Sequence, residues 1–143
     1  MAPKLYLEHA NITVDDIDEA IDFLSTAFPD FKVRGKGESV TDGVTRKWLH
    51  IGSENTYIAL ESVSSKDEGS RRPYRDIGIN HLGFVVEDVD AVSKRLESAG
   101  YKKSIDVEPH RFRKRAYYFD KNGIEYEFIE YLSDRATERN QYD

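Results

Sequence analysis

The sequence predicts an α+β protein made of two βαβββ modules, and three observations lead to this prediction. A ten-residue segment occurs twice, at 9–18 and 81–90, with equivalent residues 72 positions apart throughout. Each copy has the pattern of a strand that runs into an acidic helix start. Strand-like segments separated by turn residues follow each helix. Because two copies are too few for a solenoid, the repeat indicates a pseudo-symmetric pair of modules.

The first module is predicted over residues 4–62. Alternation in its first strand, 5–14, puts His9 and Asn11 on one face and turns Ala10, Ile12 and Val14 toward the following helix. The helix is expected at 17–27, with Asp15 or Asp16 as its N-cap and Pro29 beyond its end. Three strands are expected after it, at 31–37, 44–51 and 55–62. Turn residues separate them at 41–43 and 52–55.

A polar segment without periodicity, 63–77, is predicted to link the modules. The second module spans 78–132, and the remaining residues, 133–143, are a polar tail that forms a short helix or is frayed. Its expected elements are a strand, a helix and three further strands, at 79–86, 89–99, 101–107, 115–119 and 124–131. A tight turn at 120–123 joins the last two strands as a hairpin.

Composition excludes several classes of function. The chain of 143 residues has no cysteine, which rules out disulfides, thiolate metal sites and cysteine nucleophiles. Its net charge of −6 argues against a nucleic-acid partner. No apolar run approaches the roughly 18 residues of a membrane span, and the first residues lack the apolar region of a signal peptide. We therefore expect a cytoplasmic protein that binds no membrane.

The repeat extends into the later strands at a shorter offset of 68, which matches Leu49, Ile51, Ile58 and Leu60 to Tyr117, Phe119, Tyr126 and Phe128. In this alignment the two histidines are equivalent, whereas Glu127 has Ala59 as its counterpart. Alternation puts Glu125 and Glu127 on one face of the last strand and Glu130 on the other. Glu61, two residues after Ala59, shares the strand face of Ala59. His50 and His110 have no repeat partner and are expected at the surface.

Three stretches carry a family resemblance: LEHANITVDDIDEAIDFL, INHLGFVVEDVDAVSKRLESAG and YYFDKNGIEYEFIE. Together they resemble the vicinal oxygen chelate superfamily, which includes glyoxalase I, extradiol dioxygenases, fosfomycin-resistance enzymes and bleomycin-binding proteins. The resemblance covers most of the chain and implies a curved, cup-shaped mixed sheet of the glyoxalase-like kind. It also implies that a divalent metal ion is held by His9, His81 and Glu127. The fourth ligand position of glyoxalase I falls on Ala59. The two-histidine, one-glutamate set is more similar to that of the dioxygenases and fosfomycin-resistance enzymes.

Two imidazoles and one carboxylate leave open coordination positions on Fe²⁺, Mn²⁺, Ni²⁺ or Zn²⁺ and do not select sharply among these ions. The resemblance therefore implies a lyase or isomerase, a ring-cleaving dioxygenase or a thiol transferase. Its substrate would be a small molecule that chelates the metal through adjacent oxygens. The alternative is a metal-free protein that sequesters an antibiotic. Many relatives form dimers, and a homodimer is expected here, with a monomer left open.

Further residues are assigned to this expected site. Glu61 is the candidate fourth ligand or general base. Asn11, on the face of His9, is assigned to substrate binding. Arg113 and Arg115 share a strand face and are assigned to an anionic group of the substrate. The alternative for these arginines is an edge strand whose charges prevent pairing with other chains.

Overall fold

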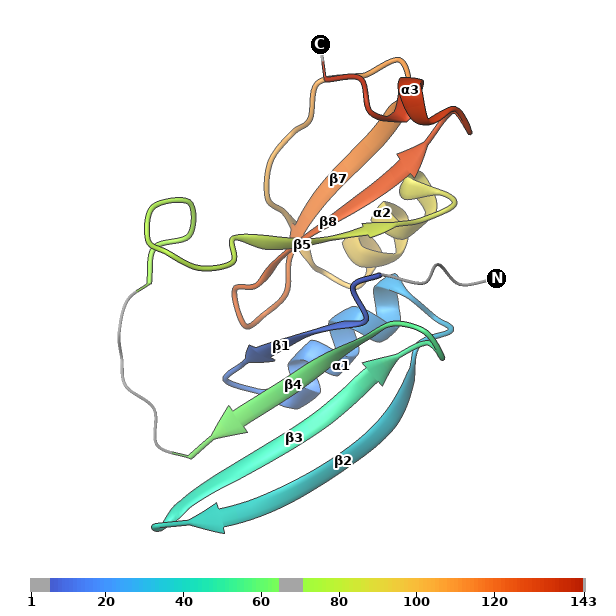
Figure 1. Cartoon of the computed structure of the whole chain (residues 1–143). Helices are drawn as coiled ribbons and strands as arrows, with labels where there is room; N and C mark the ends of the chain where they lie inside the picture. The colour runs from blue at the N-terminus through green and yellow to red at the C-terminus, as the bar shows by residue number, and fades with distance from the viewer. Residues whose placement is uncertain (1–5, 65–70, 143) are drawn as a thin grey trace. The chain divides into compact units, whose positions relative to one another are not determined.

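The structure is a computed structural model that describes residues 6–64 and 71–142. It divides into two compact units, residues 1–70 and 71–143 (Figure 1). The boundary falls within the segment predicted as the linker. Each unit contains a four-stranded mixed sheet and one helix of ten or eleven residues, which confirms the α+β class. None of the helices among the described residues is long and apolar enough to cross a membrane.

The first unit has the predicted order of elements. These are β1 (His9–Thr13), α1 (Ile17–Ala27), β2 (Lys32–Thr41), β3 (Val44–Gly52) and β4 (Tyr57–Val63). The strands lie in the order β1-β4-β3-β2, with β1 parallel to β4 and the other neighbours antiparallel. Asp16 is the N-cap of α1, because its side chain accepts from the backbone N–H groups of Asp18 and Glu19.

The helix packs against one face of this sheet. Ala20, Phe23, Leu24 and Ala27 are its fully buried residues, and the sheet contributes the buried side chains Leu49, Ile51, Ile58 and Leu60. On β1, Ala10 and Ile12 are less exposed than their neighbours His9 and Asn11. The alternation therefore puts His9 on the face of the sheet away from α1.

The second unit repeats this topology. Its elements are β5 (His81–Val85), α2 (Val89–Ser98), β6 (Lys102–Lys103), β7 (Arg113–Phe119), β8 (Glu125–Tyr131) and α3 (Ala136–Arg139). The strand order is β5-β8-β7-β6, with β5 parallel to β8. The buried residues of α2 and the sheet form its core; these are Val89, Val92, Leu96, Tyr118, Tyr126 and Phe128. The equivalence of the modules is thus confirmed within each unit.

Two expected strands have different lengths in the structure. β2 continues to Thr41 because a turn at Asp42 and Gly43, both with positive φ, lets it pair with β3 up to the turn. In contrast, the strand expected at 101–107 is reduced to the two residues of β6. Ser104 still donates a backbone hydrogen bond to Tyr117, but the chain then leaves the sheet before Pro109. Most of β7 is consequently an edge strand.

The strand register corrects one part of the repeat. β4 and β8 align at the predicted offset of 68, since His9 pairs with Tyr57 and His81 pairs with Glu125. Ala59 is therefore the counterpart of Glu127, as expected.

The alignment of β3 with β7 was wrong by one residue. Ala59 pairs with His50, and Glu127 pairs with Tyr117, so His50 is the counterpart of Tyr117. The cause is the hairpin loop, which spans residues 53–56 in the first unit and the longer stretch 120–124 in the second. His50 therefore has a repeat partner, and it lies on the same sheet face as His9.

Asp120 closes the hairpin that carries Glu125 and Glu127. Its Oδ1 accepts from the backbone N–H groups of Asn122 at 2.9 Å and Ile124 at 2.8 Å. The side chain is buried, and this burial raises the pKa of Asp120 even though the backbone N–H groups act in the opposite direction. A single buried carboxylate thus fixes the turn between β7 and β8.

We predict opposite effects for two substitutions of Asp120. Asp120→Ala leaves buried N–H groups without an acceptor and should cost about 1–3 kcal/mol of unfolding free energy. Asp120→Asn keeps the Oδ1 acceptor and removes the charge. Because the folded-state pKa is raised, wild type should lose stability relative to Asp120→Asn as the pH rises through that pKa. Urea unfolding across the acidic range measures both effects. If the unfolding free energy of Asp120→Asn minus that of wild type decreased with rising pH, this account would be contradicted.

Candidate metal and substrate site

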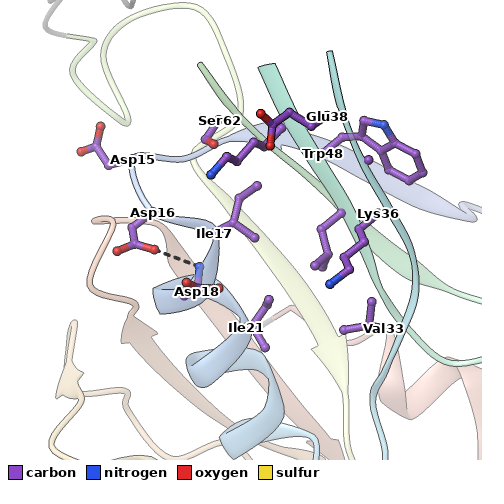
Figure 2. Close-up of a pocket in the computed structure, with 13 residues that line it drawn as sticks. Asp15, Asp16, Ile17, Asp18, Ile21, Val33, Lys36, Glu38, Trp48 and Ser62 are labelled. Atoms are coloured by element: carbon purple, nitrogen blue, oxygen red, sulfur yellow. Dashed lines mark hydrogen bonds between the residues drawn. The ribbon is translucent and has the colours of Figure 1, made fainter. Parts of the chain in front are cut away.

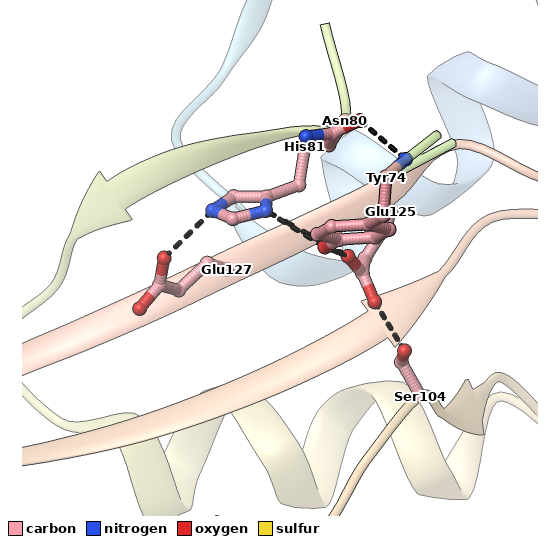
Figure 3. A network of polar contacts seen from close by, with 6 residues as sticks. All are labelled: Tyr74, Asn80, His81, Ser104, Glu125 and Glu127. Carbon is pink, nitrogen blue, oxygen red and sulfur yellow. Dashed lines mark hydrogen bonds and ion pairs between the residues drawn. The ribbon is translucent and has the colours of Figure 1, made fainter. Parts of the chain in front are cut away.

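His81 and Glu127 form a close pair in the second unit. They lie on the parallel neighbours β5 and β8, where His81 pairs with Glu125 and Gly83 pairs with Glu127. The His81 Nε2 lies 3.0 Å from Glu127 Oε2 (Figure 3). Glu127 is buried, and the His81 side chain is 30% exposed. One buried carboxylate and one accessible imidazole therefore meet on the face of the sheet opposite α2.

The other ring nitrogen of His81 contacts a second polar group. Its Nδ1 lies 3.0 Å from the Tyr74 hydroxyl, which in turn donates to Glu125 (Figure 3). Glu125 is also buried, and its second oxygen accepts from the Ser104 hydroxyl. As predicted, Glu125 and Glu127 share a face. Glu130 is on the other face and accepts from the backbone N–H of Val89 at 2.9 Å, at the start of α2.

The pair His81–Glu127 fits a divalent cation. Two acceptor atoms that face each other at 3.0 Å repel unless a proton or a cation lies with them. Imidazole nitrogen and carboxylate oxygen are ligands shared by Zn²⁺, Mn²⁺ and Fe²⁺. Gly83 lies beside the carboxylate, because a Cβ added there would be at ordinary contact distance, 3.6 Å, from Glu127 Oε2. The second unit therefore brings two of the three predicted ligands together, and their metal role stays a prediction.

Tyr117 and Arg115 extend this site along β7. The Tyr117 hydroxyl hydrogen-bonds to Glu127, and its ring lies edge-on to His81 with 5.6 Å between centroids. Burial, followed by the neighbouring Glu127, raises the pKa of Tyr117 to about 12, so this hydroxyl keeps its proton at neutral pH. Arg115 hydrogen-bonds to Tyr117 and places a guanidinium next to the pair.

Arg113 has a different contact from the one predicted. Its Nη1 donates to the backbone carbonyls of Gln141 at 2.8 Å and Arg139 at 3.2 Å. Its guanidinium also lies over the Tyr142 ring. Arg113 therefore holds the C-terminal segment, whereas Arg115 interacts with Tyr117, the neighbour of Glu127, and the predicted binding of an anionic group by both arginines stays a prediction.

His9 belongs to a row of rings on the first unit. Its imidazole stacks on Tyr57 at 4.6 Å, and His50 stacks on Tyr57 at 4.8 Å. Trp48 follows at 5.0 Å from His50, and the Arg34 guanidinium lies 4.1 Å from the Tyr57 ring centre. The His9 Nδ1 contacts Glu8 at 2.9 Å. His50, which we expected in a plain surface role, thus lies on the face that carries the predicted ligand.

The other predicted residues of the first unit surround this row. Asn11 is exposed and pairs with Ala59, the vacant ligand position, which is almost completely buried. Glu61 pairs with Thr13, which follows Asn11 as the next residue of β1 on this face. The Glu61 carboxylate lies 3.6 Å from the Arg46 guanidinium. This ion pair gives Glu61 a partner of opposite charge, and its predicted role as ligand or base stays a prediction.

His9 lies in the first unit, whereas His81 and Glu127 lie in the second. Neither unit, over the residues that the structure describes, brings three or more His, Asp or Glu side chains into a group that could hold a metal by itself. The convergence of the three predicted ligands on one metal ion therefore stays a prediction, and the pair that the second unit brings into contact is His81 and Glu127.

The first unit also contains a cavity of about 780 Å³ between the start of α1 and strands β2 and β3 (Figure 2). Its lining includes the apolar side chains Ile17, Ile21 and Leu49 and the charged side chains Lys36 and Asp18. Ile17 and Leu49 belong to the helix-covered side of the sheet, away from His9. Trp48 of the ring row also lines this cavity, so the cavity reaches the row at that residue.

The sequence analysis did not identify Tyr74 and Ser104 as part of the surroundings of His81, and it did not predict that Glu125 supports this histidine. Tyr74 lies in a segment without periodicity, and Ser104 lies just beyond β6, the two residues that remain of the predicted strand 101–107. Only Glu125 carried a signal, because alternation put it on the face of Glu127.

Comparisons with known proteins agree with this architecture. The family model described as Glyoxalase/Bleomycin resistance protein/Dioxygenase superfamily matches residues 6–128. No match was found among curated proteins.

Several solved structures share the fold at low sequence identity. A glyoxalase family protein from Bacillus cereus is 18% identical with a TM-score of 0.75, over 92% of this chain and 97% of that one. The fosfomycin resistance protein FosX from Listeria monocytogenes, in complex with Mn(II) and sulfate, is 18% identical with a TM-score of 0.63, over 98% and 100%.

A FosX mutant complexed with Mn(II) and 1S,2S-dihydroxypropylphosphonic acid is 18% identical with a TM-score of 0.65, over 97% of this chain and 100% of that one. At these identities the structural likeness shows the fold alone. The family model, however, covers most of the sequence, and the chain belongs to the Glyoxalase/Bleomycin resistance protein/Dioxygenase superfamily.

Proposed function

We propose that this protein is an enzyme that depends on a divalent metal ion and acts on a small, anionic substrate with two adjacent oxygens. The single observation that carries the proposal is the pair His81 and Glu127, whose possible metal-ligating atoms, Nε2 and Oε2, lie 3.0 Å apart. His9, the repeat equivalent of His81, would supply the third ligand. A divalent ion at such a site acts as a Lewis acid that stabilises negative charge developing on a chelated oxygen.

The side chains around the pair have distinct tasks in this proposal. The raised pKa of Tyr117 keeps its hydroxyl protonated, so that it can hold Glu127 or donate to a substrate oxygen. Arg115, which contacts Tyr117, can pair with a phosphonate or carboxylate through two parallel N–H groups. Glu61 is the proposed base, because it is the carboxylate that shares the strand face of Ala59. Asn11 would orient the substrate beside His9.

The FosX complex supports the substrate class. Its ligand, 1S,2S-dihydroxypropylphosphonic acid, has two adjacent hydroxyl oxygens and one anionic group, and it occurs together with Mn(II). A ligand set of two histidines and one glutamate is compatible with ring-cleaving oxygenation, isomerisation or thiol addition to an epoxide. Oxygen uptake with a catechol tests the first reaction, a glutathione–methylglyoxal assay tests the second, and thiol consumption with an epoxide tests the third.

We predict that the purified protein binds about one Mn²⁺ or Zn²⁺ per set of three ligands. His81→Ala, Glu127→Gln and His9→Ala should each weaken binding on the order of 100-fold or more, because each removes a direct ligand. Isothermal titration of the metal-stripped protein measures this change. His110→Ala is the matched control, since the His110 Nδ1 accepts from the backbone N–H of Phe112 instead.

Wild-type protein that binds no divalent ion, or a His81→Ala variant that binds as tightly as wild type, would refute the metal-dependent function. Binding of an aromatic antibiotic by such a metal-free protein would instead support the sequestration alternative, and the ring row around Tyr57 would be the surface to test.

We predict that Arg115→Gln weakens binding of methylphosphonate to the Mn²⁺-loaded protein by roughly 10- to 100-fold, because a charge-assisted hydrogen bond is lost. Arg113→Gln provides a control on the same strand and should leave this affinity unchanged. It should instead increase amide exchange at residues 140–142, since Arg113 holds the carbonyls of that segment. Equal loss of methylphosphonate binding in both variants would contradict the distinction.

We also propose a homodimer in which His9 of one chain completes the site of the other. Mixing His9→Ala with His81→Ala variants should then restore roughly a quarter of the wild-type sites, through mixed dimers that contain one intact site. Titration with Mn²⁺ after joint refolding counts these sites. No recovery would indicate that each chain completes its own site.

A further inference from the structure

We propose that Tyr74, Glu125 and Ser104 form a support that fixes the ring orientation and tautomer of His81, with Tyr74 as the positioning residue. This inference rests on the proposed function, because the orientation of His81 matters to the protein only if His81 binds a metal. The structural observation behind it is independent of any metal: a chain of polar contacts leads from Ser104 through Glu125 and Tyr74 to His81 (Figure 3).

The direction of each hydrogen bond follows from the groups involved. A carboxylate only accepts, so the hydroxyl protons of Tyr74 and Ser104 both point to Glu125. The Tyr74 oxygen has then used its only proton, and it can interact with the His81 Nδ1 at 3.0 Å solely as an acceptor. The His81 Nδ1 must therefore carry a hydrogen. Nε2, the nitrogen that faces Glu127, is then the one that can give up its proton and present a lone pair to a cation.

The donor role of Tyr74 is secured by its surroundings. The side chain as a whole is 61% exposed, but its hydroxyl lies between His81 and the buried Glu125. A tyrosine hydroxyl is protonated across the neutral range, and here its proton has the buried Glu125 carboxylate as acceptor.

The backbone around Tyr74 holds the residue in an uncommon conformation. Its φ is 66°, in the left-handed region that bulky residues rarely adopt. The Tyr74 N–H donates to Asn80 Oδ1 at 2.6 Å, and Asn80 immediately precedes His81. The turn is also closed by Asp76, whose carboxylate accepts from the Arg72 backbone at 2.6 Å and from its guanidinium at 3.0 Å. These contacts tie the segment before β5 to the first residue of that strand.

Glu125 completes the support from the opposite side. It lies on β8, two residues before Glu127, and pairs with His81 across the parallel strands. Its nearer oxygen lies 3.7 Å from the His81 Nδ1, on the side of the ring away from Glu127. Glu125 is therefore not placed to share a cation with Glu127. It instead anchors the Tyr74 hydroxyl, as second carboxylates behind metal-binding histidines do in general.

The test compares Tyr74→Phe with wild type. This change removes one oxygen and keeps the ring, so the fold should be retained. In metal-free protein at alkaline pH, where imidazoles are neutral, the Tyr74 oxygen and Glu127 compete for the single ring hydrogen of His81, and we expect wild type to keep an Nδ1–H population in ¹⁵N spectra of the side chain. Tyr74→Phe should shift His81 to the Nε2–H tautomer, because Glu127 is then the remaining acceptor. Affinity for Zn²⁺ should fall about 10- to 100-fold in the same variant.

Tyr142→Phe is the matched control. Tyr142 lies in the same unit, is 87% exposed and contacts Arg113 through its ring, which phenylalanine retains. It should leave both the His81 tautomer and the Zn²⁺ affinity unchanged. Glu125→Gln is a second variant that keeps a carbonyl acceptor for Tyr74 and should preserve the Nδ1–H tautomer.

The same tautomer in wild type and Tyr74→Phe would overturn the inference, whatever the metal affinity. A wild-type protein that binds no Zn²⁺ but changes tautomer in Tyr74→Phe would refute the proposed metal-dependent function and leave the support role of Tyr74 intact. The two results are therefore distinguishable.

Discussion

The second unit depends on one imidazole placed between two buried carboxylates. Glu125 and Glu127 are both less than a tenth exposed, and His81 lies on the neighbouring strand with one ring nitrogen directed to each side. Burial of a carboxylate is costly unless hydrogen bonds or opposite charge compensate for it. Hydroxyl donors from Tyr74 and Ser104 satisfy Glu125, and the Tyr117 hydroxyl contacts Glu127. Each buried carboxylate on this face therefore has a hydroxyl group that compensates for the cost of its burial.

The two halves of the chain use the same topology for different chemistry. In the second unit the equivalent positions Glu125 and Glu127 surround His81, whereas in the first unit Tyr57 and Ala59 occupy them. The first unit consequently has a row of stacked rings where the second has carboxylates. This asymmetry puts buried carboxylates on one face of the second sheet and stacked rings on the equivalent face of the first.

Only those residues of the candidate site that belong to a local sequence pattern could be predicted. The repeat of HANITVDDID in HLGFVVEDVD identified the two histidines, and the hairpin sequence DKNG located Glu127 four residues after its glycine. The face shared by Glu125 and Glu127 followed from strand alternation. Tyr74 could not be found in this way, because its position depends on a turn closed by Asp76 and Asn80. The contacts of Arg113 with the carbonyls of a distant C-terminal segment likewise have no local signal in the sequence.

The sequence by itself determined the βαβββ order of each module and the helix 17–27. These features arise from periodicity and from contacts between residues close along the chain, which a single sequence records. Tertiary structure decided the β3 register, the loss of most of the strand after α2 and the partners of His81. Each of these depends on a loop length or a hydrogen bond between distant residues. One residue more in a hairpin loop moves every side chain of the strand to the opposite face, and no local pattern contains that information.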